Sequence, residues 1–456
     1  MRYIGIDLGA SFFKAGLLDT EQNRISRICK HSAPSPIQDC PPDRKELDPT
    51  LIWERICNLI QNVKGSTDID GILISNQMHG FIILDTLGKP RTGYITWQDN
   101  RGSDISTITK VNEAFGVHGL RNTGMPLLRG LPSLNLVHTR HNEGIKNGFF
   151  LSLGDYVSYL LCGNMAVHAS NCAGSGLMDL EQGTWNHQAL ERMGCSDFYF
   201  PPVTEDFQPM GTCQKLNNAK VFPAVGDQQA ALLGAMINDD DLSLNVGTGS
   251  QVSMISRDLV FGNFQTRPFF SGEYLKTITH IPAGRAVNVL VAFSLEMIKR
   301  VTHQEVGPVD FWKSYYDVDY TEGNLNVDPS FFSGSTTGDA GGIANIQEGN
   351  FTMQNLLAAT YRRMASNYYE LSKRIGSERA IRVIISGGML TKNAVLHKAI
   401  NNQFQPLPVM QHFSEDTLVG LYIIALTHEL GHMNFRETYQ YIEQNGLSIE
   451  DNNCVF

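Results

Sequence analysis

Two stretches of this chain, one in each half, follow the same plan of apolar strand, turn of small and hydroxyl residues, and second apolar strand. Residues 3–8 are strongly β-prone, residues 9–11 form a turn, and residues 12–18 return. Farther on, apolar residues alternate over 242–246 into a Gly-Thr-Gly turn at 247–249 and alternate out again. This weak internal repeat predicts two halves of similar architecture, each beginning with a hairpin.

The size and charge of the chain limit its partners. It has 456 residues, a length that favours two or three domains and provides ample core. Its formal charge is −10 and it has no run of lysine and arginine, so we do not expect nucleic acid as a partner. No apolar run is long enough to span a membrane. If a chain this acidic binds an anionic ligand such as a nucleotide, it must do so locally, through backbone N–H groups, a metal ion or one or two cations.

The N-terminal stretch and the cysteines predict the compartment. Residues 1–7 carry a charge, Asp7, inside a short apolar segment, which is typical of a strand and not of a signal peptide. The eight cysteines are scattered and form no Cys-x-x-Cys pair. We therefore expect reduced thiols in a cytoplasmic protein, and a homodimer stays open.

The chain divides most naturally at a polar stretch, residues 238–241, which follows a helix-like run at 229–235. We place the boundary near residue 236, which gives an N-terminal domain of residues 1–236 and a C-terminal domain of residues 237–456. Amphipathic patterns predict a helix that starts at about residue 48 and a long helix over 353–375. A buried strand at 381–385 opens into a Gly-Gly turn, and a buried helix is expected over 417–426.

A carboxylate, Asp227, stands just before the helix-like run and close in sequence to the Gly-Thr-Gly turn. A carboxylate beside a turn of phosphate size suits phosphate transfer to a hydroxyl, because it can take the proton while backbone N–H groups hold the phosphates. Alternatively, Asp227 caps a helix and the glycines make a hairpin turn. The chain has neither G-x-x-x-x-G-K-[ST] nor G-x-G-x-x-G, which disfavours P-loop and Rossmann folds.

Two such hairpins, together with a strand–Gly-Gly–helix near the end, resemble the actin/hexokinase/chaperone ATPase superfamily. Over roughly residues 1–430 the chain resembles the FGGY carbohydrate kinases, looking most like the sedoheptulokinases, with the xylulokinases next. The motifs that carry the family resemblance are Gly5-Ile6-Asp7-Leu8-Gly9-Ala10-Ser11, Gln77-Met78-His79-Gly80, Trp97-Gln98-Asp99-Asn100-Arg101, Gly226-Asp227-Gln228-Gln229-Ala230, Gly247-Thr248-Gly249 and Gly387-Gly388. The lean toward sedoheptulokinases comes from 96–99, 155–156, 161–163, 171–175 and 288–290.

The resemblance implies an α/β fold of two ribonuclease H-like domains around a deep cleft, with sugar mainly on the N-terminal half and ATP mainly on the C-terminal half. Asp227 would be the general base and lie at the metal, and Asp7 would hold Mg²⁺ through water. The residues implied at the sugar are Met78, His79, Trp97, Asp99 and Arg101. Those implied at the nucleotide are Gly9, Ala10, Ser11, Lys14, Gly247, Thr248, Gly249, Gly387, Gly388 and Asn393.

Simpler explanations compete with several of these roles. Asp7 could be a solvated turn residue, His79 a structural histidine, and Asp99 with Arg101 a surface ion pair worth under about 1 kcal/mol. The Gly-Gly stretch could be an ordinary strand–helix turn.

The chain departs from the family pattern in three places. Residues 126–132 lack the family's lysine and downstream tryptophan, Thr248 is followed by glycine where the family often has serine, and Arg285 stands where the family tends to be small and neutral. The substrate expected is a ketose with sedoheptulose favoured, the alternatives being xylulose or another FGGY sugar or polyol.

One motif points elsewhere. His428-Glu429-x-x-His432 matches the H-E-x-x-H pattern of zinc peptidases, which needs both histidines on one helix face and a third ligand. The candidate third ligands, Glu437, Glu443 and Glu450, lie in no recognisable motif, and Gly431 weakens a helix. A zinc peptidase is therefore a distant alternative. A non-catalytic sugar sensor is another, and the intact Asp7 and Asp227 argue against it.

Overall fold

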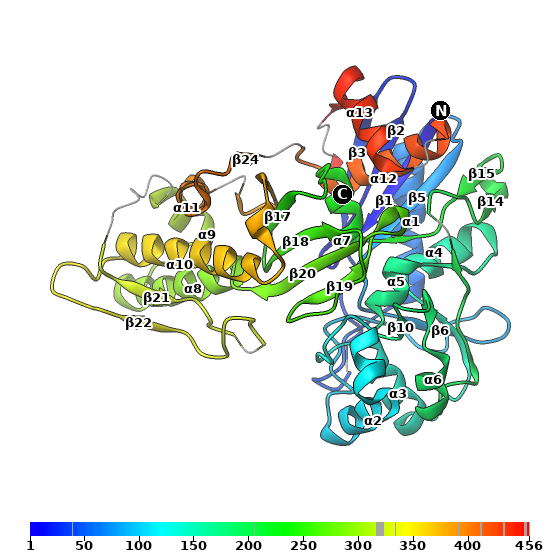
Figure 1. Cartoon of the computed structure of the whole chain (residues 1–456), viewed down its shortest axis with the longest axis horizontal. Helices are drawn as coiled ribbons and strands as arrows, with labels where there is room; N and C mark the ends of the chain where they lie inside the picture. The colour runs from blue at the N-terminus through cyan, green and yellow to red at the C-terminus, as the bar shows by residue number, and fades with distance from the viewer. Residues whose placement is uncertain are drawn as a thin grey trace.

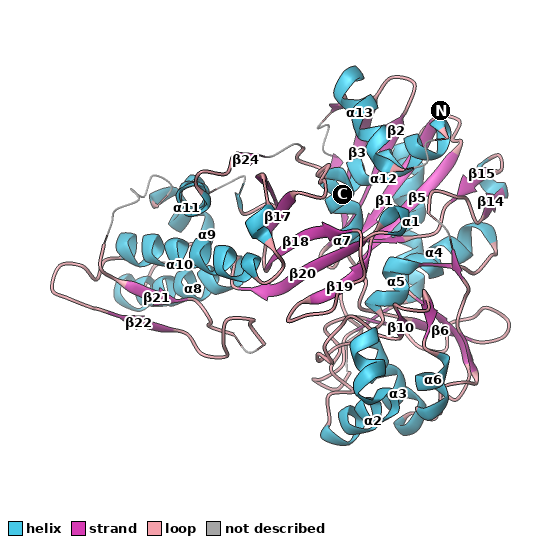
Figure 2. Ribbon diagram, viewed as in Figure 1, coloured by secondary structure: helices cyan, strands magenta, loops and turns pink. Residues whose placement is uncertain are grey.

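A computed structural model describes residues 1–38, 40–204, 206–315, 323–332, 334–390, 393–410, 413–431, 434–450 and 454–455. The chain forms two large mixed sheets that are joined by helices, with an additional helical lobe beneath the N-terminal sheet in the view of Figures 1 and 2. None of the helices in these ranges is long and apolar enough to cross a lipid bilayer.

The N-terminal sheet is built on the first predicted hairpin. Its strands are β1 (Arg2–Leu8), β2 (Phe12–Asp19), β3 (Arg24–Ser32), β5 (Gly71–Asn76), β14 (Gly211–Cys213), β15 (Ala219–Val221), β16 (Val225–Gly226), β25 (Ser448–Ile449) and β26 (Cys454–Val455). The central order is β3-β2-β1-β5-β15, where β1, β2 and β3 are antiparallel neighbours and β5 and β15 continue in parallel. Apolar residues of β1, such as Ile4 and Ile6, are fully buried.

The C-terminal sheet repeats this plan. Its strands are β17 (Asp241–Val246), β18 (Ser250–Ser256), β19 (Gln265–Pro268), β20 (Tyr274–Ile281), β23 (Arg382–Ser386) and β24 (Val409–Met410). The order β20-β18-β17-β23-β24 has the same pattern of three antiparallel neighbours followed by two parallel strands. The predicted internal repeat and α/β class are therefore confirmed, and the two halves share the ribonuclease H-like arrangement.

Each half also contains helices, some of which cover a face of its large sheet. In the N-terminal half they are α1 (Pro49–Lys64), α2 (Ile105–Asn122), α3 (Pro132–Asn142), α4 (Leu153–Cys162), α5 (Ala169–Gly174) and α6 (His187–Arg192). In the C-terminal half they are α8 (Gly284–Thr302), α9 (Pro308–Ser314), α10 (Met353–Lys373) and α11 (Ala394–Phe404). Helix α1 begins where predicted, because Asp48 accepts a hydrogen bond from Thr50 N and Pro49 occupies the first turn.

The remaining strands make small sheets around the main ones. They are β4 (Glu46–Leu47), β6 (Ile82–Leu84), β7 (Tyr94–Ile95), β8 (Gly148–Leu151), β9 (Val167–His168), β10 (Met178–Asp179), β11 (Thr184–Trp185), β12 (Phe198–Tyr199), β13 (Val203–Thr204), β21 (Asn326–Asp328) and β22 (Gly342–Ala344). Among them, the sheet β12-β8-β6 packs with α2, α3 and α6 around its own apolar cluster, which includes Phe81 and Phe150.

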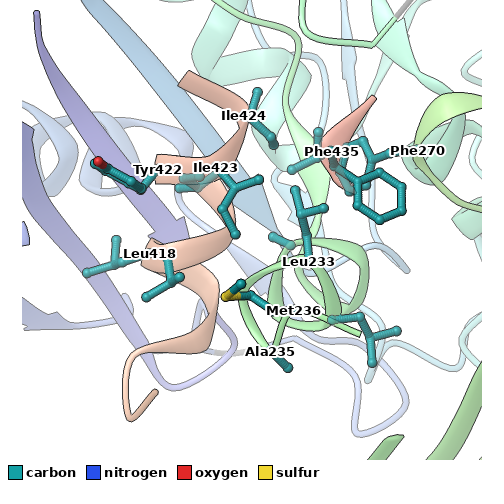
Figure 3. Packing of buried hydrophobic residues seen from close by; sticks show 14 of the residues in the cluster. Leu233, Ala235, Met236, Phe270, Leu418, Tyr422, Ile423, Ile424 and Phe435 are labelled. Atoms are coloured by element: carbon teal, nitrogen blue, oxygen red, sulfur yellow. The ribbon is translucent and has the colours of Figure 1, made fainter. Parts of the chain in front are cut away.

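Two crossing helices join the halves. Helix α7 (Asp227–Gly234) packs against α12 (Asp416–Leu430), and α13 (Phe435–Asn445) completes their apolar cluster, as Figure 3 shows. The backbones touch at two glycines: a Cβ added to Gly234 would lie 1.8 Å from Asp416 O, and one added to Gly420 would lie 1.9 Å from Ala230 O. Glycine is required at both positions because any side chain would push the helices apart.

After α12 the chain returns to the N-terminal sheet. Strands β25 and β26 both pair with β3, and α12 also packs on β1 and β5. The division at residue 236 stays a prediction, and the last residues of its C-terminal part lie against the N-terminal sheet.

The crossing gives a stability prediction. We expect Gly420→Ala to lower the free energy of unfolding by at least about 2 kcal/mol, because the new methyl group would overlap the backbone of α7. Urea unfolding measures the loss. Gly342→Ala is the matched control, since an added Cβ there meets no atom within 4 Å. Equal stability of the two variants would contradict the close crossing.

Candidate active site

The predicted base and the predicted metal carboxylate come together at one sheet edge. Strands β1 and β16 run parallel to β5 on either side of it, with Asp7 opposite Ser75 and Gly226 opposite Asn76. Asp227 follows Gly226 directly as the first residue of α7. Because parallel strands end at the same edge, the two carboxylates meet there, and the Ser75 hydroxyl donates to Asp7 over 2.9 Å.

Burial and mutual repulsion make both carboxylates harder to ionise. Burial, followed by the charge of Asp7, raises the pKa of Asp227 to about 7, against the opposing effects of the Gln228 backbone N–H and Arg267. Burial also raises the pKa of Asp7, although Lys14 and the Ser75 hydrogen bond work in the other direction. A carboxyl whose pKa lies near neutrality is suited to exchanging a proton with a substrate hydroxyl.

Met78 and His79 lie beside Asp227. A Cβ added to Gly226 would lie 2.3 Å from Met78 Sδ, and one added to Gly174 would lie 2.6 Å from Met78 Cβ, so Met78 is held between these two backbones. His79 Nδ1 is 2.6 Å from Gly174 O. That nitrogen therefore donates, and Nε2 is left as an acceptor. Burial and the neighbouring Arg267 lower the pKa of His79 to about 3, so the ring is neutral.

Arg267 and Gln228 belong to this cluster, although the sequence did not single them out. Arg267 lies on β19 and is only 4% exposed, and its Nη1 and Nη2 each donate over 2.5 Å, to Gln228 Oε1 and Gln265 Oε1. Burial lowers the pKa of Arg267 to about 10, and Asp227 opposes that effect. The signal in the sequence was an arginine close to the apolar residues Phe264, Phe269 and Phe270, 40 residues after Asp227.

Gln228 in turn connects the turn of Asp227 to the C-terminal sheet. Its Nε2 donates to Thr277 Oγ1 over 3.0 Å and to Ser253 Oγ over 3.3 Å. The residue after the predicted base is thus fixed by β18, β19 and β20 together.

Asp99 and Arg101 form a buried ion pair and not the surface pair that was the alternative. Arg101 donates to Asp99 through Nε and Nη2, both over 2.8 Å, and reaches Glu46 and Glu143 at 2.5 and 3.1 Å. Although burial alone would lower it, the hydrogen bonds and charges of Asp99 and Glu46 raise the pKa of Arg101. Their contact with sugar stays a prediction, as does that of Trp97, whose side chain is 42% exposed.

The turns predicted for the nucleotide lie together in the C-terminal half. The backbone N–H groups of Gly284 and Arg285 donate to Gly247 O and Thr248 O over 3.1 and 2.8 Å, which fixes the turn against the start of α8. Gly387 has a φ of 95°, and a Cβ there would lie 2.4 Å from Val246 O. The Gly-Gly stretch therefore packs directly on the Gly-Thr-Gly turn.

The structure also defines the contacts of Asn393 and Lys14, which were predicted at the nucleotide, and of Arg285, which departs from the family pattern. Asn393 caps α11, with its side chain accepting from Leu396 N over 2.9 Å. The Arg285 guanidinium lies 4.6 Å from the centre of the Phe332 ring. Lys14 is paired with Glu415, at the start of α12.

The turn of the first hairpin lies at the edge of the N-terminal sheet that carries Asp7. Gly9, Ala10 and Ser11 connect β1 to β2, and Ser11 O accepts from Ala33 N over 2.9 Å. The turn thus lies directly after Asp7.

Of the H-E-x-x-H motif, the structure describes His428 and Glu429, which lie in the last turn of α12. Helix α12 ends at Leu430, and Gly431 adopts a left-handed conformation with φ 65°. His432 lies outside the described residues, and His428 Nε2 lies 3.0 Å from Lys220 Nζ. Within the described ranges, no group of three or more His, Cys, Asp or Glu side chains is arranged to hold a metal ion.

The structure thus combines two halves of the same sheet plan with two carboxylates, Asp7 and Asp227, at one sheet edge. The model of the N-terminal domain of the FGGY family of carbohydrate kinases matches residues 2–234, which are more than half of the chain. The chain belongs to this family, and membership of a kinase family implies ATP as the phosphate donor.

Relatives and solved structures agree with the family. The chain is 22% identical to the sedoheptulokinase of Mus musculus over 477 aligned positions, covering 94% of this chain and 98% of that protein. It is 29% identical to the xylulose kinase of Bacillus subtilis, with 55% of this chain and 53% of that enzyme matched; several such relatives match over only about half their length. The crystal structure of ligand-bound xylulose kinase from Lactobacillus acidophilus has a TM-score of 0.81 at 19% identity, covering 96% and 92% of the chains.

The zinc content of the purified protein distinguishes a kinase from the peptidase alternative. We expect the purified protein to contain no stoichiometric zinc, and the double variant His428→Ala with His432→Ala to keep its kinase turnover within about threefold, because His428 contacts Lys220 and Phe222, which are not residues of the candidate site. Elemental analysis and an ATP-coupled assay measure the two outcomes. Bound zinc with an activity that a chelator removes would favour the peptidase.

Proposed function

We propose that this protein is an ATP-dependent kinase that phosphorylates a primary hydroxyl of a ketose. The observation that carries the proposal is the buried Asp227 beside Asp7 at the shared edge of β1, β5 and β16. In this function Asp227 takes the proton from the sugar hydroxyl as the oxygen attacks the γ-phosphate of ATP in line. Holding both reactants in position supplies much of the rate enhancement.

The residues present fit Mg²⁺ and the phosphates. Mg²⁺ prefers one or two carboxylates together with substrate phosphate oxygens, and Asp7 and Asp227 offer such a pair. Bound there, the ion would offset charge on the phosphates. On the nucleotide side, Gly249 has no atom within 4 Å of an added Cβ, so the backbone of the turn is open to a phosphate group.

One buried group supports a polyhydroxy substrate directly, because His79 keeps an acceptor, Nε2, that a substrate hydroxyl can satisfy and an unpaired buried group costs about 1–3 kcal/mol. Asp99 and Arg101 already pair with each other and with Glu46 and Glu143, and they would border the sugar as a fixed, charged wall. The match to mouse sedoheptulokinase along nearly the whole chain favours sedoheptulose, to give sedoheptulose 7-phosphate. Xylulose is the alternative, because several of the relatives and solved structures that resemble this chain are xylulose kinases.

We further propose that sugar lies mainly on residues 1–236 and nucleotide mainly on 237–456, and that the protein works in the cytoplasm. The Asp227 cluster lies at the end of the first part, and both glycine turns of the second part pack together. Six cysteines of the described residues are free thiols, which suits a reducing compartment: Cys40, Cys57, Cys162, Cys172, Cys195 and Cys213.

The role of Asp227 is tested by Asp227→Asn. The amide keeps the shape of the side chain but cannot accept the proton, so we expect kcat to fall by at least about 100-fold while ATP binding survives. Steady-state kinetics and nucleotide titration measure both. Asp197→Asn, on the surface and 63% exposed, is the control. Near-normal turnover of Asp227→Asn would remove Asp227 from the role of base.

The substrate is tested by side-by-side kcat/KM values for sedoheptulose, xylulose, ribulose, gluconate and glycerol. We expect sedoheptulose to lead and glycerol to be worse by at least about 100-fold, because it leaves buried polar groups unpaired. If xylulose leads, only the preference for seven carbons is wrong. If glycerol or an aldose leads by about tenfold or more, the ketose assignment fails.

A further inference from the structure

A continuous chain of hydrogen bonds leads from Gly226, the residue before Asp227, to Ser271 in the C-terminal half of the molecule. Residues 226–227, where β16 meets α7, are called the turn of Asp227 below. The backbone N–H of Gly226 donates to Ser170 Oγ over 2.8 Å, and Ser170 Oγ lies 2.7 Å from His168 Nδ1. His168 Nε2 lies 2.7 Å from Asp206 Oδ1, and Asp206 Oδ2 accepts from Ser271 N over 2.5 Å. Ser271 lies in the turn between β19 and β20, so this chain spans both halves.

The directions of these bonds are mutually consistent. Asp206 accepts at both oxygens, so His168 Nε2 carries a proton and donates to it, which leaves His168 Nδ1 to accept from the Ser170 hydroxyl. Ser170 Oγ can then accept from Gly226. With a neutral imidazole, one arrangement of protons satisfies every polar group in the chain, and partial satisfaction would be costly at such burial.

The chain is buried at His168 and Ser170 and reaches the surface at its far end, where the Asp206 side chain is 21% exposed and Ser271 is exposed. His168 is 2% exposed and Ser170 is 1% exposed. The ring of Phe270 lies 5.4 Å from the His168 ring, and Phe207 stacks on Phe270 at 5.7 Å. Its far end is strained, because Ser271 has a φ of 60°, a conformation that non-glycine residues adopt only when the surroundings enforce it. The Asp206 carboxylate supplies one such constraint.

We propose that His168 and Asp206 are positioning residues that hold the turn of Asp227 in line with the β19–β20 turn of the C-terminal half. They act through Ser170 and the Gly226 N–H and touch neither substrate. The inference rests on the proposed function in that Asp227 is the base for the sugar hydroxyl. Transfer then depends on this turn, because an error of about 1 Å in the position of a reacting group can cost about 100-fold in rate.

His168→Asn tests the proposal without removing the helix cap. His168 is the N-cap of α5 and accepts from Ser170 N over 3.2 Å. Asparagine is a preferred N-cap, so α5 stays capped, but its shorter side chain does not reach Asp206. We expect kcat to fall by roughly 10- to 100-fold while KM for sugar and for ATP changes by less than about threefold.

A second variant tests whether His168 and Ser170 act through one and the same chain of hydrogen bonds. Ser170→Ala removes the acceptor of the Gly226 N–H, and we expect the double variant with His168→Asn to lose no more kcat than the worse single variant, because both interrupt one chain. Losses that multiply would show two independent effects and overturn the proposal. His141→Asn is the matched control: its Nε2 contacts Met193 O at 3.0 Å, on α3 and away from Asp227.

Hydrogen exchange separates failure of this proposal from failure of the proposed function. We expect residues 225–228 to exchange at least about tenfold faster in His168→Asn than in the wild type or His141→Asn, whatever the substrate. A wild type that phosphorylates none of the sugars contradicts the proposed function, and faster exchange would still support the chain. Unchanged exchange, or a lower melting temperature with unchanged kcat, overturns the positioning role.

Discussion

The contact between the backbones of α7 and α12 determines where the rest of the candidate site can lie. Gly234 and Gly420 let the two helices touch at main-chain distance, and Leu233, Tyr422 and Phe435 pack around them (Figure 3). Helix α7 begins with Asp227, so the crossing that joins the halves also fixes the carboxylate. A change in the angle of this crossing would move the base and both sheets together, because packed helices shift as rigid units.

Short helix α5 holds the other parts of the site relative to Asp227. Its Ser170 accepts from Gly226, its Asn171 donates to Asn76 and to Ala224 O, and its Gly174 O accepts from His79. Six residues thus connect the ends of β5 and β16 and the histidine. A helix this short has little stability of its own, and these buried tertiary contacts, each worth about 1 kcal/mol net, keep it in place.

The sequence predicted the fold better than it predicted the neighbours of each site residue. Period-two alternation and the repeated Gly/hydroxyl turn predicted the two hairpins and the internal repeat, and the family resemblance implied the two ribonuclease H-like halves. Arg267 and Asp206 could not be found this way, since their contacts with Gln228 and His168 join residues about 40 apart. Asp99 and Arg101 were found as a pair, but not their enclosure by Glu46 and Glu143, which depends on tertiary packing.

The distribution of charge explains how an acidic chain can hold an anionic nucleotide. At the shared strand edge the negative groups Asp7, Asp227 and Glu415 outnumber the cation Lys14, and the buried Arg267 offsets only part of this. Such an edge repels phosphate unless a divalent cation binds first or the carboxylates take up protons. Backbone N–H groups of the glycine turns carry no net charge and lie in the other half. In the proposed function, the fold therefore separates the carboxylate that would take the proton, Asp227, from the backbone donors available to the phosphates, and the α7–α12 crossing joins the two halves that carry them.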